Sequence, residues 1–264
     1  MTPLRRTRSL LSPALFLPWS RRWGLRLWLI ALPVAGWGLW TAFFVAPTDA
    51  RQGEVYRLLY LHVPAAWMSM FVYLVMALHC AAGWVWRAKV SWALAQGLAP
   101  VGAGYTVVAL LTGALWGRPT WGAWWVWDAR LTSELLLLVL YAGVMVLLGA
   151  FDDRERGRRA AGLLAIAGLV NLPVIYFSVV WWNTLHQGAT LSPSQGALLA
   201  PAMLHALLAM TFAAWSPAAG PGLLRAHQLP RDQSRPDAQL RPGRPQAPVA
   251  RLRPGIEPSE LTTT

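Results

Sequence analysis

Four tryptophans stand within seven residues in the run WGAWWVWD, which ends in an acid. Tryptophan commonly anchors a helix end at a membrane surface, because its indole is apolar and carries one N–H. One or two indoles suffice for an anchor, so this density indicates a platform for a large, flat, apolar ligand. If the run is helical, one face holds three indoles and the acid, namely Trp121, Trp124, Trp125 and Asp128, and Trp127 points elsewhere.

Two histidines follow or precede long apolar stretches. His62 lies in LHVPAAWMSM, where Pro64 suits the first turn of a helix, so we expect His62 just outside that helix. His186 follows Trp181 and Trp182 in VVWWNTLHQG. A single histidine at a membrane surface is usually an ordinary surface residue, and a terminal tryptophan is usually a belt residue. Two neutral imidazoles beside a plane of indoles, however, match the axial ligands and rim contacts of haem.

The two propionates of a haem would need cations. Arg57 and Arg130 are the candidates, because a guanidinium binds a carboxylate in a two-pronged geometry. Glu134 stands four residues after Arg130. A carboxylate one turn into lipid is costly unless paired, so pairing of these two would compete with propionate binding. Asp128 suits the N-cap of the next helix, and this is compatible with holding the loop beneath a ligand.

The chain that carries these residues has the composition of a polytopic membrane protein. Of its 264 residues, 56% are hydrophobic and 13% are charged, against about 25% charged in soluble domains. Six stretches meet or approach the ~20 residues that cross a bilayer core. We therefore predict an all-α fold with six transmembrane helices, at 24–46, 63–86, 93–117, 130–151, 161–182 and 197–215.

Basic residues predict the orientation of these helices. One side of the predicted spans holds 19 of the 23 Lys and Arg residues. The positive-inside rule then places both termini in the cytoplasm and the loops 47–62, 118–129 and 183–196 on the outer face. The net charge of +12 follows from this asymmetry and from the tail, so it does not indicate nucleic-acid binding.

The two ends of the chain and its single cysteine bear on the topology and on how haem could be attached. Residues 1–23 form a basic lead-in, and the Arg21-Arg22 pair resembles a twin-arginine signal. The next span is too long for a signal sequence and lacks a cleavage site, so we predict an uncleaved helix. Residues 24–215 form the bundle, and 216–264 are expected to be a disordered Pro/Arg-rich tail in the cytoplasm. With only Cys80 and no CxxCH, haem is not attached covalently.

Residues inside the predicted spans give weaker signals. His79 is expected near the cytoplasmic side of the second span, and His205 lies in the sixth; both favour structural roles. Asn171 and Pro173 predict a kink with a buried polar group that other helices satisfy.

The motif WGAWWVWDARLTSELL resembles the signature of the tryptophan-rich "WWD" haem-handling proteins of cytochrome c biogenesis. Together with LHVPAAWMSM and YFSVVWWNTLHQG, it is most similar to the six-span haem exporter protein C (CcmC) family. The likeness covers about residues 24–215, and the Pro/Arg tail has no counterpart that we can place.

The resemblance implies a site at the periplasmic face of the bacterial inner membrane. His62 and His186 would be the axial ligands of the iron of a non-covalent, transient haem b. Gly122 would permit close approach, Asp128 would set the loop, and four indoles would line the haem edge, at Trp121, Trp124, Trp125 and Trp127.

The resemblance also implies partners. Haem would be loaded onto the periplasmic haem chaperone CcmE, with the single-span helper CcmD and the ABC transporter subunits CcmA and CcmB taking part. The chain itself has no nucleotide motif, so we expect a haem-transfer protein in the lipid bilayer rather than an enzyme.

Two other functions are compatible with parts of this pattern. A cytochrome b-type electron-transfer subunit would also use paired histidines, but it usually buries them within the bundle, whereas His62 and His186 are expected at helix ends. A small-molecule permease would use the tryptophans only as anchors and would bind no chromophore.

Overall fold

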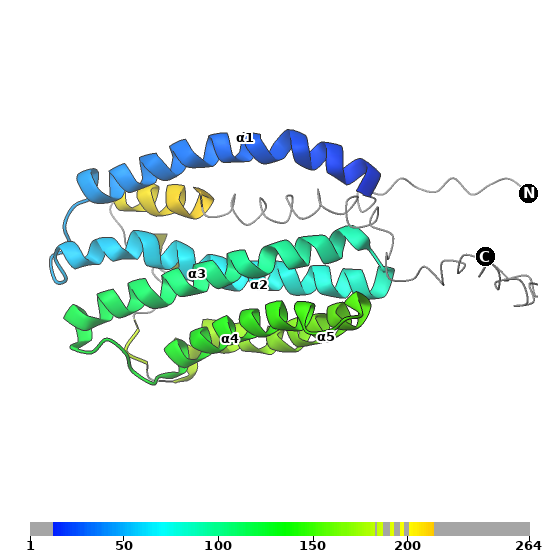
Figure 1. The fold of residues 1–264 in the computed structure, drawn as a ribbon. Coiled ribbons are helices and arrows are strands. Elements are labelled where there is room, and N and C mark those ends of the chain that lie inside the picture. The colour runs from blue at the N-terminus through cyan, green and yellow to red at the C-terminus, as the bar shows by residue number, and fades with distance from the viewer. Residues whose placement is uncertain (1–12, 183, 187–190, 193–195, 198–200, 214–264) are drawn as a thin grey trace, which may run out of the picture. The chain divides into compact units, whose positions relative to one another are not determined.

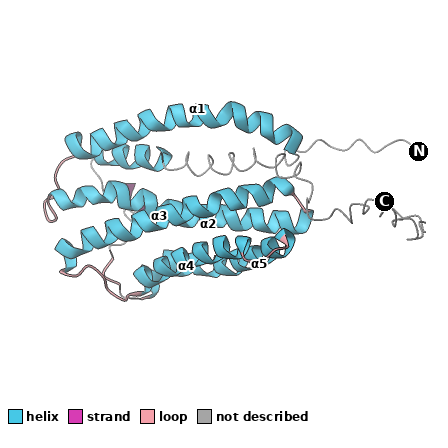
Figure 2. Ribbon diagram, in the orientation of Figure 1, coloured by secondary structure: helices cyan, strands magenta, loops and turns pink. Residues whose placement is uncertain are grey.

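The computed structural model describes residues 13–182, 184–186, 191–192, 196–197 and 201–213 (Figure 1). All of them belong to the first of two compact units, residues 1–229. These residues are helical except for loops and two short antiparallel strands (Figure 2), β1 (Leu191–Ser192) and β2 (Gly196–Ala197). The predicted all-α class is confirmed. The predicted disorder at 216–264 concerns residues outside the described ranges.

Within the described residues, five helical runs are long and apolar enough to cross a membrane, which confirms a polytopic membrane protein. The sixth predicted span is described only as the shorter apolar helix Pro201–Ala213. The first helix begins at Pro13, within the predicted lead-in. The remaining elements, in chain order, are α1 (Pro13–Trp40), the π-helical η1 (Thr41–Val45), the 3-10 turn η2 (Glu54–Leu58), α2 (Leu59–Trp86), α3 (Lys89–Trp121), α4 (Ala129–Gly149), α5 (Arg154–Ala167), the 3-10 turn η3 (Gly168–Val170) and α6 (Asn171–Trp181).

The second span starts earlier than the sequence suggested. Helix α2 begins at Leu59 and is preceded directly by η2, so His62 is the fourth residue of the helix and Pro64 lies inside it. The prediction that His62 stands outside the helix is therefore wrong. Proline has a helical φ, so α2 continues past Pro64 with the loss of one main-chain hydrogen bond.

Beyond Trp121 the tryptophan run is not helical, so the condition for a shared face of its indoles is not met. Helix α3 ends at Trp121, and its C-cap is Gly122, whose φ of 79° is left-handed and whose N–H donates to the Arg118 carbonyl at 3.0 Å. Glycine favours this conformation because it has no Cβ. The chain then runs without helical structure to Asp128, the N-cap of α4.

The main core lies among α2, α3, α4 and α5, which pack side by side (Figure 1). At its centre Tyr73 and Tyr141 meet edge to face, with ring centroids 5.0 Å apart. Gly102 leaves the space that Tyr141 fills, since a Cβ there would lie 2.0 Å from the hydroxyl oxygen. This packing fixes α3 and α4 against α2.

The helix of the predicted fifth span is irregular near the kink predicted at Asn171 and Pro173. The short η3 turn separates α5 from α6, ahead of Pro173. Asn171 is buried and donates through its side chain to the Ser133 carbonyl of α4 at 2.9 Å. The neighbouring helix thus satisfies the buried amide, as expected inside a bilayer.

Candidate functional site

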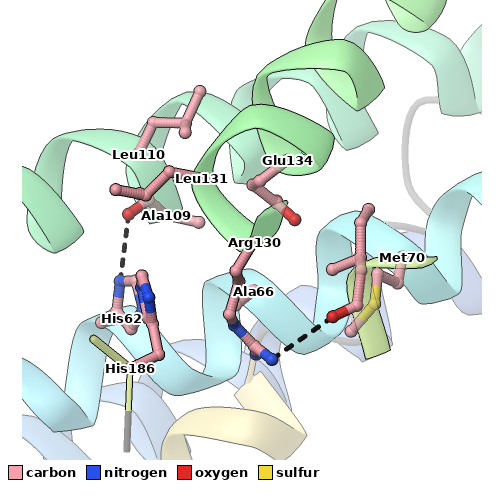
Figure 3. Close-up of a pocket in the computed structure, with 10 residues that line it drawn as sticks. His62, Ala66, Met70, Ala109, Leu110, Arg130, Leu131, Glu134 and His186 are labelled. Atoms are coloured by element: carbon pink, nitrogen blue, oxygen red, sulfur yellow. Dashed lines mark hydrogen bonds between the residues drawn. The ribbon is translucent and has the colours of Figure 1, made fainter. Parts of the chain in front are cut away.

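A pocket brings the two predicted histidines together (Figure 3). The cavity between them is small, about 20 Å³. His62 comes from α2 and His186 from the segment after α6. Arg130 and Glu134 of α4 add two more ionisable side chains, and the rest of the lining is apolar except for main-chain groups: Ala66, Met70, Ala109, Leu110, Leu131 and Ile175.

The His62 ring is held through one nitrogen. Its Nδ1 lies 3.0 Å from the Ala109 carbonyl oxygen and 3.1 Å from the Thr112 hydroxyl. A carbonyl can only accept, so Nδ1 carries the proton and donates it. The Thr112 hydroxyl donates to the Val108 carbonyl at 2.6 Å, which leaves its oxygen free to accept. Nε2 therefore keeps the lone pair that a metal needs.

His186 is held in the same way by a carboxylate. Its Nδ1 lies 3.3 Å from Asp128 Oδ2, and both side chains are nearly buried. Burial lowers the pKa of His186, against the opposing effect of Asp128, so the ring is neutral at pH 7 and donates from Nδ1. The other Asp128 oxygen accepts from the Leu131 N–H at 2.8 Å and caps α4. The predicted N-cap is confirmed, and the same residue also fixes His186.

The four tryptophans of the run occupy different environments. Trp121 meets the His186 ring edge to face at a centroid distance of 4.9 Å. Trp125 and Trp127 contact each other at 5.3 Å, and the buried Trp125 indole N–H has no partner among the described residues. Trp124 and Trp127 are 58% and 75% exposed. Of these four, Trp121 has the ring contact with a pocket histidine given above, and none of the four is among the described residues that line the pocket.

Arg130 and Glu134 both line the pocket, and the ion pair considered for them does not form among the ion pairs of the described residues. Arg130 donates to the Ile175 carbonyl at 3.4 Å (Figure 3). Glu134 accepts from the Ser69 hydroxyl of α2 at 2.7 Å. Glu134 therefore makes no contact that would compete with a haem propionate for the Arg130 guanidinium.

Arg57 is not among the described residues that line the pocket. Its guanidinium pairs with Glu54 and donates to the carbonyls of Ala42 and Ala46, the latter at 3.1 Å. It joins η2 to the end of the first span. Its role as a propionate partner stays a prediction.

Several residues that contact His62 were not predicted from the sequence. Besides Ala109 and Thr112, they are Gly113 and Trp116, all on α3. Their spacing of three, four and seven residues marks one helix face. That spacing was visible in the sequence, but in an apolar span nothing showed which face meets the histidine.

The other histidines lie elsewhere. His79 is half-buried in α2 and His205 is exposed in the helix Pro201–Ala213. Neither is among the described residues that line the pocket.

Fold and site together define a polytopic helical membrane protein in which two histidines, each hydrogen-bonded through Nδ1, line a largely apolar pocket. The chain matches the family model "Heme exporter protein C" (CcmC) over residues 6–237. It is 52% identical over 175 residues to heme exporter protein C of Escherichia coli strain K12, covering 66% of this chain and 69% of that protein. The protein of the same name from Haemophilus influenzae is 45% identical over 183 residues, covering 69% and 74%. This chain belongs to the CcmC family.

Proposed function

We propose that this chain binds haem between His62 and His186 and delivers it to a periplasmic haem chaperone for cytochrome c maturation. One observation carries the proposal: both imidazoles line one pocket, and each is already engaged through Nδ1. Their Nε2 atoms are then the free ligands. Membership of a family whose relatives are named heme exporters supports haem as the cargo.

The pair of histidines suits presentation of haem rather than chemistry on it. Two axial histidines would occupy both faces of the iron and so suppress oxygen chemistry there. Arg130 is the cation that lines the pocket and would bind a propionate. Trp121 packs against His186, and the exposed Trp124 and Trp127 would meet the haem rim or an incoming protein.

The asymmetry of basic residues supports a bacterial inner-membrane location with the site on the periplasmic side. The chaperone CcmE would receive the haem there. The helper CcmD would join the complex, and an ATPase built from CcmA and CcmB would drive release of the loaded chaperone.

The test is transfer of haem from the purified protein to the chaperone. Haem-loaded protein is mixed with the apo-chaperone in detergent together with CcmD, CcmA, CcmB and ATP, and covalent haem is then detected on a denaturing gel. Transfer should fail for His62→Ala and His186→Ala and persist for His79→Ala. Since His62 lies within α2, its position no longer argues against an electron-transfer subunit. Haem that stays bound and is reversibly reduced by quinol would overturn our proposal in favour of that function.

A further inference from the structure

One face of α3 surrounds the His62 ring. Two of its residues, Ala109 and Thr112, meet Nδ1 at 3.0 and 3.1 Å. Trp116, one turn further along, meets the ring edge to face at a centroid distance of 5.8 Å and an angle of 80°. Because Gly113 lies between them on the same face, its missing side chain leaves the space that the ring occupies.

The Gly113 position leaves almost no room for a methyl group. A Cβ there would lie 3.1 Å from Cε1 of His62 and 3.5 Å from Nδ1, whereas carbon atoms in favourable contact are about 3.5–4.0 Å apart. Gly113 does not have a left-handed backbone, so no turn requires a glycine. Glycine also disfavours a helix relative to alanine. Space for the imidazole is therefore the physical reason for glycine here.

The aromatic side of this face is itself held in place. The Trp116 indole donates to the Gln52 side-chain oxygen at 2.6 Å. Its ring also meets Tyr56 edge to face at 5.8 Å. Two contacts thus hold the Trp116 ring in place where it packs against His62.

We propose that Gly113, with Thr112 and Trp116, is a positioning residue that sets the depth and orientation of His62, so that Nε2 faces the pocket. The inference rests on the proposed function, since it concerns the ligand role of His62 toward haem. A metal-bound imidazole is normally oriented by a contact at its other nitrogen, and loss of that contact weakens metal binding by about 10–100-fold. The α3 face supplies this contact by hydrogen bond and by shape.

The experiment compares Gly113→Ala with Gly104→Ala on the same helix, where a Cβ would meet nothing within 4 Å. Each purified variant is titrated with haem, its absorption and EPR spectra are recorded, and its thermal unfolding is measured. Gly104→Ala should keep the low-spin, six-coordinate spectrum of the unsubstituted protein. Gly113→Ala should shift haem toward a five-coordinate, high-spin form, weaken binding about tenfold, and regain the low-spin spectrum when millimolar imidazole is added.

A Gly113→Ala protein that folds and matches the Gly104→Ala spectrum and affinity would overturn the inference. If Gly113→Ala does not fold, Thr112→Val decides the question, since it removes one Nδ1 contact with little change of volume; a normal spectrum and affinity would then overturn the inference. If His62→Ala loses haem but Gly113→Ala keeps a normal haem spectrum and affinity, the positioning role is refuted and the proposed function stands. An unsubstituted protein that binds no haem overturns both.

Discussion

Asp128 serves two partners with its two oxygens, and one substitution can separate them. Oδ1 caps α4 at the Leu131 N–H, 2.8 Å away, and Oδ2 accepts from Nδ1 of His186 at 3.3 Å. Asp128→Asn keeps the size and the capping ability, because asparagine is as good an N-cap as aspartate. With the amide oxygen at the cap, the NH₂ group faces Nδ1. The imidazole must then carry its proton on Nε2, where it blocks iron binding.

The expected loss follows from the hydrogen bond. Bonds to charged groups contribute about 1.5–3 kcal/mol. At 3.3 Å this one is longer than the ~2.7–2.9 Å of strong charge-assisted bonds, so we take the lower end. Since 1.4 kcal/mol is about tenfold, Asp128→Asn should weaken haem binding roughly tenfold and leave unfolding almost unchanged. Asp128→Ala should weaken binding similarly and also lower the free energy of unfolding by ~1 kcal/mol through the lost cap.

The assay is a haem titration of the detergent-solubilised apo-protein, followed at the Soret band, with denaturant unfolding of each variant alongside. An Asp128→Asn protein that binds haem as tightly as the unsubstituted chain would refute the reasoning. So would an equal loss of unfolding free energy in both variants, because asparagine would then have failed as a cap.

Three further outcomes follow from the contacts described above. Arg130→Met should weaken haem binding about tenfold but leave the affinity for haem dimethyl ester unchanged; equal losses in the two titrations would exclude a propionate contact. Joint substitution of Trp124 and Trp125 by Leu should reduce haem retention or chaperone loading, and unaltered values of both would make them belt residues only. Asn171→Ala removes the donor to the Ser133 carbonyl and should lower the free energy of unfolding by about 1 kcal/mol while the haem spectrum stays normal; an undiminished unfolding free energy would show that this bond contributes nothing.

Hydropathy and local capping patterns predicted the parts of the site that depend on short stretches of chain. Asp128 was expected to cap the fourth span, and it does. An irregularity near Asn171 was also expected, because Pro173 affects its own helix locally. His62 and His186 were both predicted at the outer face of the membrane, and the structure brings them together in one pocket.

Tertiary contacts explain what could not be predicted. The start of α2 depends on η2, which Arg57 ties to the first span, and no local pattern indicated that turn. In a membrane helix both faces are apolar, so hydrophobic periodicity does not mark the face that meets a site. For this reason Gly113 and Trp116 could not be assigned to His62 from sequence alone, although their spacing places them on one side of α3.

The central claim is that His62 and His186 together hold one haem. The most direct measurement is the absorption spectrum of the detergent-purified protein from haem-supplied cells, with the His62→Ala, His186→Ala and His79→Ala variants beside it. We predict a low-spin Soret band that changes in the first two variants and persists in the third. A colourless unsubstituted protein, or equal changes in all three variants, would contradict the account.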